Sequence, residues 1–331
     1  MTKTRPILAK WLNSLAFSRS GKTGHAAAFG RRAESSMMNI ANGRNAAVAA
    51  AGLALTAMTA PSQGGLTSGT FAEHQAFGQN YLVGGSAVAQ TGGAVVGFRA
   101  YSNVFAGGQQ DTTATMLSDR YGMIGYHQIN QILNSNPTFE ISTGPNAQNN
   151  RGLVVSISRL ILFPNGSQVS TSLPEYVIFE LSQPLVGVRP VTIGSAVPGQ
   201  SLGSAGFGSW ANPGGSFVRT FDVTGGVGPV RATNLNGYSS QYYFQTAFDP
   251  LYTLNWRGAN GDSGAPAFDA AGNLIGMTVA GTNGTGAFGQ TTFLRLDNPT
   301  VYNDIAPYIP SPGAAVPLAL GAAFAFRRRR E

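Results

Sequence analysis

Gly261-Asp262-Ser263-Gly264-Ala265-Pro266 is the stretch that decides the fold of this 331-residue chain. A serine between glycines on a tight turn suits an acyl-transfer nucleophile, because glycine tolerates strained backbone angles and lets a substrate carbonyl approach the main chain. The strand-like run 274–281 follows the turn, and the run 292–296 follows a Gly-rich loop. The stretch therefore predicts a nucleophile, Ser263, in a β-rich half of the molecule.

The composition predicts a β-rich protein that needs no cofactor. Glycine accounts for 44 residues and charged residues for 11% of the chain, which indicates many tight turns and few surface helices. Short apolar runs such as 153–157 and 176–179 recur between Gly, Pro and Asn clusters, as in all-β sandwiches and barrels. The absence of cysteine excludes thiol catalysis and Cys-bound zinc. Since the sequence has no metal-ligand cluster or phosphate-binding loop, we expect neither a metal nor a cofactor.

The net charge of +7 does not indicate nucleic-acid binding once the charges are located along the chain. All the lysines lie in residues 1–22, and Arg327 to Arg330 form a run at the far end. Between residues 61 and 310, 9 arginines stand against 12 aspartates and glutamates, a balance of −3. A protein that binds phosphate carries its basic residues on the binding domain. We therefore expect no nucleic-acid partner.

The region that begins at Gly261 resembles the C-terminal lobe of trypsin-like serine proteases. The nucleophile turn, a second turn at 269–273 and the run 274–281 follow one another in the order of that family, and Ala265 replaces the commonest second glycine. The resemblance implies an all-β fold of two six-stranded antiparallel β-barrels. We expect the first barrel at residues 85–194, the second at 195–310, and the active site at their junction.

A serine nucleophile needs a general base, which is usually a histidine. His25 precedes the predicted export signal and His74 precedes the predicted barrels, which leaves His127 as the candidate. The segment 114–127 resembles the strand-turn-strand that delivers the catalytic histidine in the family, with Gly125-Tyr126 in place of the usual Ala-Ala. We predict His127 as the base, and a lone surface or core histidine is the alternative interpretation.

The third member of such a site is a carboxylate that orients the imidazole. No aspartate lies between His127 and Asp222. The family places its aspartate at the start of a hydrophobic strand, and the corresponding segment here, 175–184, begins with Glu175. The resemblance thus assigns this role to Glu175. Asp222 is the fallback, and Glu175 as a surface residue at a strand edge is the alternative.

The resemblance also implies how the nucleophile loop is arranged. The backbone N–H groups of Gly261 and Ser263 would form the oxyanion hole. Asp262 would lie buried behind the serine and pair with a cation. That cation is either a new amino terminus, since Leu82-Val83-Gly84-Gly85 resembles the family's mature start, or an arginine such as Arg257.

Three residues are predicted to contact the substrate. Arg257 stands six residues before Ser263, at the floor of the primary pocket in this family, so the acidic floor that selects Lys or Arg is absent. Val279 and Gly281 belong to the strand that forms the wall of this pocket. A cationic floor selects acidic residues, unless Arg257 fills the pocket or points away from it.

Both ends of the chain resemble address signals. An apolar run at 46–58, preceded by Arg44, is typical of a secretory signal peptide, so residues 1–60 are an extension plus signal and 61–84 the mature N-terminal segment. Residues 311–331 form the predicted sorting signal: together with Pro310 they contain a Pro-Ser-Pro motif, an apolar stretch and four arginines, and resemble a PEP-CTERM signal. A buried Ala-rich helix and a plain tail anchor are the respective alternatives.

These features together predict an exported, monomeric serine endopeptidase that cleaves polypeptides through a His-Glu-Ser triad and an acyl-enzyme. The terminal signals imply an exosortase-like sorting enzyme as a partner and only transient membrane contact. They place the protein in the periplasm, at the cell surface or outside a bacterium of the Gram-negative type. The alternative is a catalytically impaired relative, a pseudoprotease, that serves as a surface binding or structural module.

Overall fold

The computed structural model describes residues 69–83, 93–211, 217–232, 237–247, 254–256, 258–281 and 290–310. The predicted signal peptide, the predicted sorting signal and Arg257 lie outside these described residues. Among the helices within them, none is long and apolar enough to cross a lipid bilayer.

Six strands close the first barrel. They are β1 (Val95–Tyr101), β2 (Gln109–Met116), β3 (Tyr121–Ile124), β4 (Thr138–Ser142), β5 (Val154–Ile161) and β6 (Val177–Leu181). Their order around the barrel is β1-β2-β3-β6-β5-β4, with antiparallel pairing throughout. Apolar side chains such as Phe98, Ile124 and Phe179 fill its interior.

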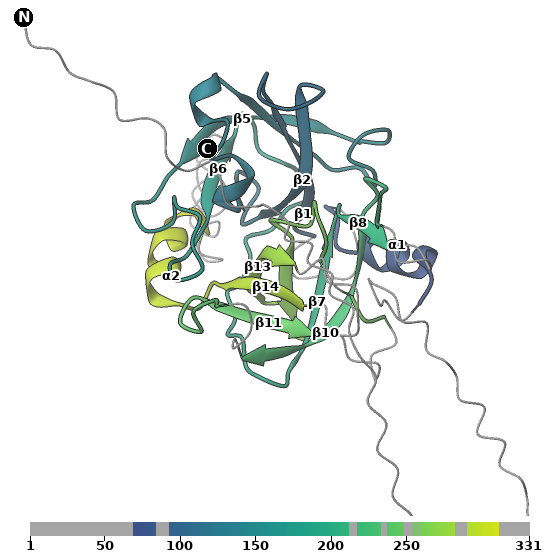
Figure 1. Cartoon of the computed structure of the whole chain (residues 1–331), viewed down its shortest axis with the longest axis vertical. Coiled ribbons are helices and arrows are strands. Elements are labelled where there is room, and N and C mark those ends of the chain that lie inside the picture. Colours follow the sequence, from purple (N-terminus) through teal and green to yellow (C-terminus); the bar gives the residue numbers. More distant parts are fainter. Residues whose placement is uncertain are drawn as a thin grey trace, which may run out of the picture. The chain divides into compact units, whose positions relative to one another are not determined.

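Six further strands close the second barrel. They are β7 (Ser201–Gly206), β10 (Thr224–Ala232), β11 (Tyr243–Ala247), β12 (Pro266–Asp269), β13 (Leu274–Gly281) and β14 (Gln290–Arg295). Their order is β10-β11-β14-β13-β12-β7, again antiparallel, and β8 (Ser209–Ala211) pairs with β9 (Phe217–Arg219) in a separate two-stranded sheet. Figure 1 shows the first barrel in blue to teal and the second in green to yellow.

The predicted fold class, two six-stranded antiparallel barrels, is confirmed by this topology. Strand β6 shows why its sequence suits the fold. Its side chains alternate: Val177, Phe179 and Leu181 enter the core of the first barrel, whereas Ile178 joins a cluster shared by both barrels. A strand buried on both faces reads as a nearly continuous apolar run, as this one does. The domain limits at 85–194 and 195–310 enclose these strands and stay predictions.

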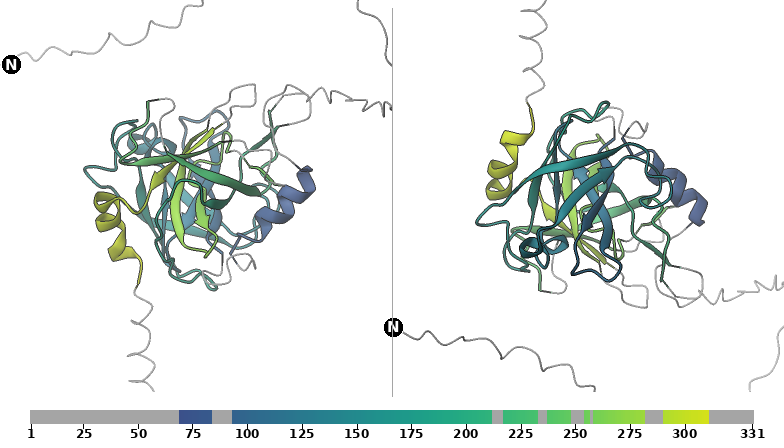
Figure 2. Two further views of the ribbon diagram at one scale, coloured as in Figure 1. Left: turned by 90° about the horizontal axis from the view of Figure 1, so that it is seen from below. Right: turned by 90° about the horizontal axis from the view of Figure 1, so that it is seen from above.

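Two α-helices flank the barrels on opposite sides (Figures 1 and 2). Helix α1 (Phe71–Gln79) begins with a capping box in which Glu73 N–H donates to Thr70 Oγ1 (3.3 Å) and Thr70 N–H donates to Glu73 Oε2 (2.7 Å). It packs on β10 and β7 of the second barrel.

Helix α2 (Pro299–Ile305) begins at the cap Asn298 and buries Val301 and Ile305 in the shared cluster. Three short 3-10 helices complete the described elements: η1 (Tyr126–Gln128), η2 (Leu133–Ser135) and η3 (Ala306–Tyr308).

Candidate active site

His127 lies between Ser263 and Glu175. Its Nε2 is 2.7 Å from Ser263 Oγ, and its Nδ1 is hydrogen-bonded to Glu175 Oε1. Because a carboxylate only accepts hydrogen bonds, Nδ1 carries the ring hydrogen, and unprotonated Nε2 is left to accept the proton of the serine hydroxyl. The structure therefore brings together the three residues that the sequence singled out, from segments 48 and 136 residues apart.

The turn that presents His127 is held in place by hydrogen bonds of its neighbour Gln128. Gly125 N–H donates to Gln128 Oε1 (2.6 Å), and Gln128 Nε2 donates to Thr112 Oγ1 (2.6 Å) and to Thr113 O (3.1 Å). Gln128 is buried, so its amide satisfies backbone groups that water does not reach. These bonds fix η1 to strand β2 and leave the imidazole 27% exposed toward solvent and substrate.

Glu175 stands at the entry of β6 with only 4% of its surface exposed. Its chain neighbour Tyr176 is anchored on α2, where the phenol donates to Asp304 Oδ2 (2.5 Å). Burial raises the pKa of the Tyr243 phenol, and the nearby Glu175 carboxylate raises it further. The carboxylate thus sits in a protected place between the barrels, and the surface interpretation of Glu175 is wrong.

The fallback Asp222 and two other glutamates of the chain lie elsewhere. The fallback Asp222 accepts a hydrogen bond from Asn146 Nδ2 (2.9 Å). Glu140 pairs with Arg151 (2.5 Å), and Glu180 pairs with arginines of the first barrel. None of the three has a hydrogen bond to His127 within the described part of the chain.

The nucleophile loop belongs to the second barrel but is held by the first. Thr113 Oγ1 donates to Gly261 O (2.9 Å) and Thr115 Oγ1 donates to Gly264 O (2.6 Å), both from β2. Thr113 N–H donates to Ser263 O (3.3 Å). Gly261 and Gly264 adopt φ values of 101° and 88°, which only glycine tolerates without strain.

Two backbone donors in this loop stay free. Among the hydrogen bonds of the described residues, none uses the amide N–H of Gly261 or of Ser263. Paired backbone groups are the rule in a folded interior, and Gly261 is buried. Two unused donors beside Ser263 are what the predicted oxyanion hole requires.

Asp262 is buried behind Ser263, with 1% of its surface exposed. Its carboxylate accepts hydrogen bonds from the N–H groups of Gly208 (2.7 Å) and Ala259 (2.8 Å). Burial raises the pKa of Asp262 to about 7, against the lowering effect of these bonds and of the Arg219 charge. The nearby cation in the described part of the chain is thus Arg219, a residue that the sequence did not single out.

The predicted substrate contacts are only partly visible. Val279 on β13 is 6% exposed and packs in the shared cluster, so its side chain contributes chiefly to the core. Gly281 ends β13 against the backbone of Gly258, where a Cβ would lie 2.3 Å from the carbonyl oxygen. Gly258 N–H in turn donates to Thr291 Oγ1 (2.7 Å). With Arg257 outside the described residues, the selectivity of the primary pocket stays a prediction.

Several residues that build the site were missed from the sequence. Thr113, Thr115 and Gln128 hold the segments of Ser263 and His127 to strand β2, and the three threonines at 112, 113 and 115 in a buried strand were the available signal. His74, a buried residue of α1, lies with its Nδ1 2.6 Å from Gly225 O. In the described residues, no group of three or more His, Cys, Asp and Glu side chains is arranged to hold a metal ion.

Comparison with protein-family models gave no match, and comparison with curated proteins gave none either. Solved structures that are similar to this one include an inactivated protease paralogue of the scabies mite, which is 16% identical in sequence and has a TM-score of 0.48. That similarity covers 65% of this chain and 94% of the mite protein. Another is neuropsin, a serine protease expressed in the limbic system of mouse brain, which is 16% identical with a TM-score of 0.47 over 63% of this chain and 93% of neuropsin.

Proposed function

We propose that this protein is a serine endopeptidase that hydrolyses peptide bonds through Ser263, His127 and Glu175. The observation that carries the proposal is the double hydrogen bond of His127, to Ser263 Oγ at 2.7 Å on one side and to a buried carboxylate on the other. A solvent-exposed histidine without a role has no need of a buried carboxylate partner.

The arrangement supports acyl transfer in two stages. In the first, Ser263 Oγ attacks the scissile carbonyl carbon while His127 Nε2 takes the hydroxyl proton. The C–N bond then breaks, and His127 gives that proton to the leaving amine, so that an ester with Ser263 remains. In the second stage, water attacks the ester carbonyl carbon while His127 Nε2 takes a proton from the water. The bond between that carbon and Ser263 Oγ then breaks, His127 gives the proton to Oγ, and the carboxylic acid product leaves.

The charges that develop during these steps have partners in place. Glu175 stabilises the imidazolium that forms when His127 takes the proton. The free N–H groups of Gly261 and Ser263 stabilise the negative oxygen of the tetrahedral intermediate.

The proposal is tested with a fluorophosphonate probe, which phosphonylates an activated serine. We expect covalent labelling of the purified protein, located at Ser263 by peptide mass spectrometry and rising from acidic to alkaline pH. The Ser263→Ala and His127→Ala variants are the matched controls and should not label. Failure of the folded wild-type protein to label at any pH would contradict the proposal and favour the non-catalytic surface module.

We further propose that the enzyme is exported, on the basis of the sequence patterns at 1–60 and 311–331. Fractionation of bacterial cells that express the protein tests this proposal. An epitope tag, which is detected without any need for activity, is inserted between the two terminal signals. We expect the tag outside the inner membrane, and a variant without residues 37–60 should stay in the cytoplasm. A cytoplasmic wild-type protein would overturn the proposal of export without affecting that of proteolysis.

A further inference from the structure

The side chain of Arg219 joins the two barrels beside the nucleophile loop. It extends from β9, and its guanidinium donates through Nη1 to Asn260 O and through Nη2 to Asp111 O. The guanidinium lies 4.9 Å from the ring centroid of Phe221, on which it stacks. In the described part of the chain, no hydrogen bond joins Asn260 or Arg219 to His127 or Glu175, so the three-residue site does not account for these contacts.

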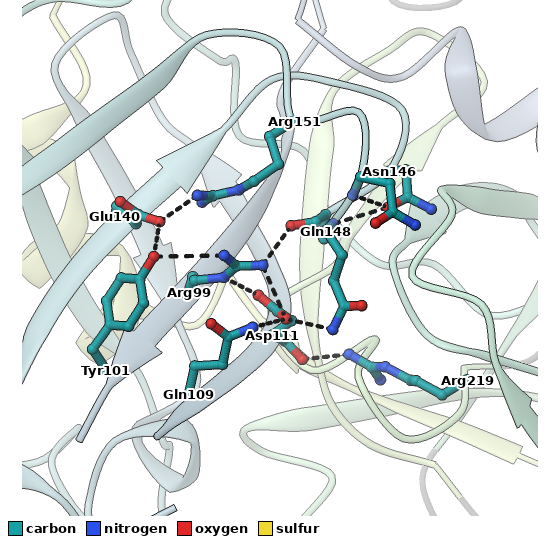
Figure 3. A network of polar contacts seen from close by, with 11 residues as sticks. Arg99, Tyr101, Gln109, Asp111, Glu140, Asn146, Gln148, Arg151 and Arg219 are labelled. Carbon is teal, nitrogen blue, oxygen red and sulfur yellow. Dashed lines mark hydrogen bonds and ion pairs between the residues drawn. The ribbon is translucent and has the colours of Figure 1, made fainter. Parts of the chain in front are cut away.

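One of the two carbonyls belongs to Asp111, whose side chain lies in a polar network (Figure 3). Asp111 on β2 forms a two-point ion pair with Arg99 on β1, with distances of 2.6 and 3.2 Å. Gln109 and Gln148 donate to the same carboxylate, at 3.4 and 3.2 Å. Because these bonds hold Asp111, its carbonyl is a fixed point on the first barrel to which Arg219 is tied.

The other carbonyl, that of Asn260, determines the direction in which the Gly261 N–H points, and this N–H is a proposed oxyanion donor. Asn260 O accepts from Arg219 and also from Ser209, through N–H (3.0 Å) and Oγ (3.1 Å). In a trans peptide, the carbonyl oxygen and the following N–H point in opposite directions. Since the described chain contains no cis peptide bond, holding Asn260 O on the side of Arg219 aims the N–H of Gly261 to the other side.

Gly261 allows the guanidinium to lie against the loop. A Cβ on Gly261 would stand 1.4 Å from Nη1 of Arg219, so any other residue would displace the guanidinium. Burial lowers the pKa of Arg219, and the nearby carboxylates of Asp262 and Asp111 raise it. This partly buried guanidinium is held by the two carbonyl oxygens that accept its hydrogen bonds.

We propose that Arg219 is a positioning residue of the protease: its guanidinium holds the Asn260–Gly261 peptide so that the Gly261 N–H stays aimed at the oxyanion. The inference rests on the proposed function, because it assigns a purpose to the same loop. It predicts that Arg219 acts on the transition state and leaves ground-state substrate binding unchanged.

The test compares Arg219→Ala with Arg159→Ala, a control arginine on β5 whose side chain is 61% exposed. Loss of an oxyanion donor lowers kcat by about 10²–10³-fold, so we expect a fall of that size for Arg219→Ala with KM nearly unchanged. The affinity for a peptide boronic acid, whose tetrahedral adduct places an oxygen at the same position, should fall in parallel. Millimolar guanidinium ion should restore part of kcat to Arg219→Ala, a rescue that a merely structural role does not predict.

Other outcomes separate this inference from the proposed function. If the wild-type protein labels and cleaves and Arg219→Ala does so equally fast, the inference is wrong and the proposed function stands. If the wild-type protein is inert, the proposed function itself fails. Should Arg219→Ala not fold, Arg219→Lys decides: it keeps the charge but cannot reach both carbonyls, so we expect a reduced kcat, and an unchanged kcat would overturn the inference.

Discussion

At the scale of single residues, the proposed catalytic carboxylate, Glu175, is the point where the sequence departs from the family that it resembles. A glutamate is one methylene longer than an aspartate, and the backbone of Glu175 must stand farther from the imidazole for the same contact. Glu175 lies two residues before β6, beside the anchored Tyr176, and its carboxylate reaches His127 Nδ1 from there. From the same backbone position, the shorter side chain of an aspartate would not match this contact.

This match makes Glu175 sensitive to both charge and length. We expect Glu175→Gln to lower kcat by about 10³–10⁴-fold, because an amide neither selects the required tautomer of His127 nor stabilises its cation. Glu175→Asp should also be slower, because its carboxylate falls short of Nδ1. Steady-state kinetics with a peptide ester measure both effects. Glu180→Gln on β6 is the control and should keep wild-type activity, since the ion pairs of Glu180 in the described part of the chain are with Arg120 and Arg159 of the first barrel.

The buried Asp262 predicts a pH dependence of stability. Its pKa is about 7 in the folded protein and ~3.9 in an unfolded chain, so the folded state holds a proton that the unfolded state has lost. The stability contributed by this group is complete below pH ~4 and is lost as the pH rises through about 7.

The variant Asp262→Asn isolates that effect. Asparagine does not titrate. The unfolding free energy of the wild type, taken relative to that of the variant, should therefore be higher near pH 5 and lower near pH 8. Urea denaturation at both pH values provides the measurement. A difference that does not change with pH would show that Asp262 titrates normally.

At the scale of elements, strand β2 links the barrels through threonine hydroxyls. Thr113 Oγ1 donates to Gly261 O and also accepts from Phe207 N–H (2.8 Å), so one side chain satisfies groups in two segments of the second barrel. Thr113→Val keeps the shape and leaves both groups buried without a partner. We expect a loss of about 1–3 kcal/mol in unfolding free energy and a slower acylation. Thr138→Val on β4, an exposed position, is the control, and equal stability of the two variants would contradict this role.

The same scale shows what the sequence can and cannot predict. The apolar run 176–179 predicted strand β6, because burial on both faces leaves a plain hydrophobic pattern. Helix α1 was not predicted, since its buried residues are only His74 and Gly78 and its start depends on a capping box. Arg219 and Asn260 are 41 residues apart in the chain, and no sequence pattern indicates that they are in contact.

At the scale of the whole molecule, the barrels share a large apolar cluster. The cluster contains Met123 and Ile178 of the first barrel, Leu294 of the second, and Val301 and Ile305 of α2. Because the same side chains are buried by both barrels, unfolding one barrel exposes the core of the other. We therefore expect the barrels to unfold together.

A variant in α2 tests this coupling. Ile305→Ala should lower the unfolding free energy by about 2–5 kcal/mol, as expected for a fully buried aliphatic side chain. Far-UV circular dichroism and loss of probe labelling at Ser263 should report the same denaturation midpoint. Tyr302→Ala, an exposed position on the same helix, should have little effect. Two separate transitions would show that each barrel is stable alone.

Under the proposed function, the place of Arg219 has a consequence for when activity begins. Its charge acts on Asp262 within the uncut chain, so the proposed protease would need no backbone cut to supply a charge there. Activity would then begin as soon as the barrels close, including inside the cell that makes the protein. Control over unwanted proteolysis must in that case come from keeping the chain unfolded until it reaches its destination, and not from a maturing protease.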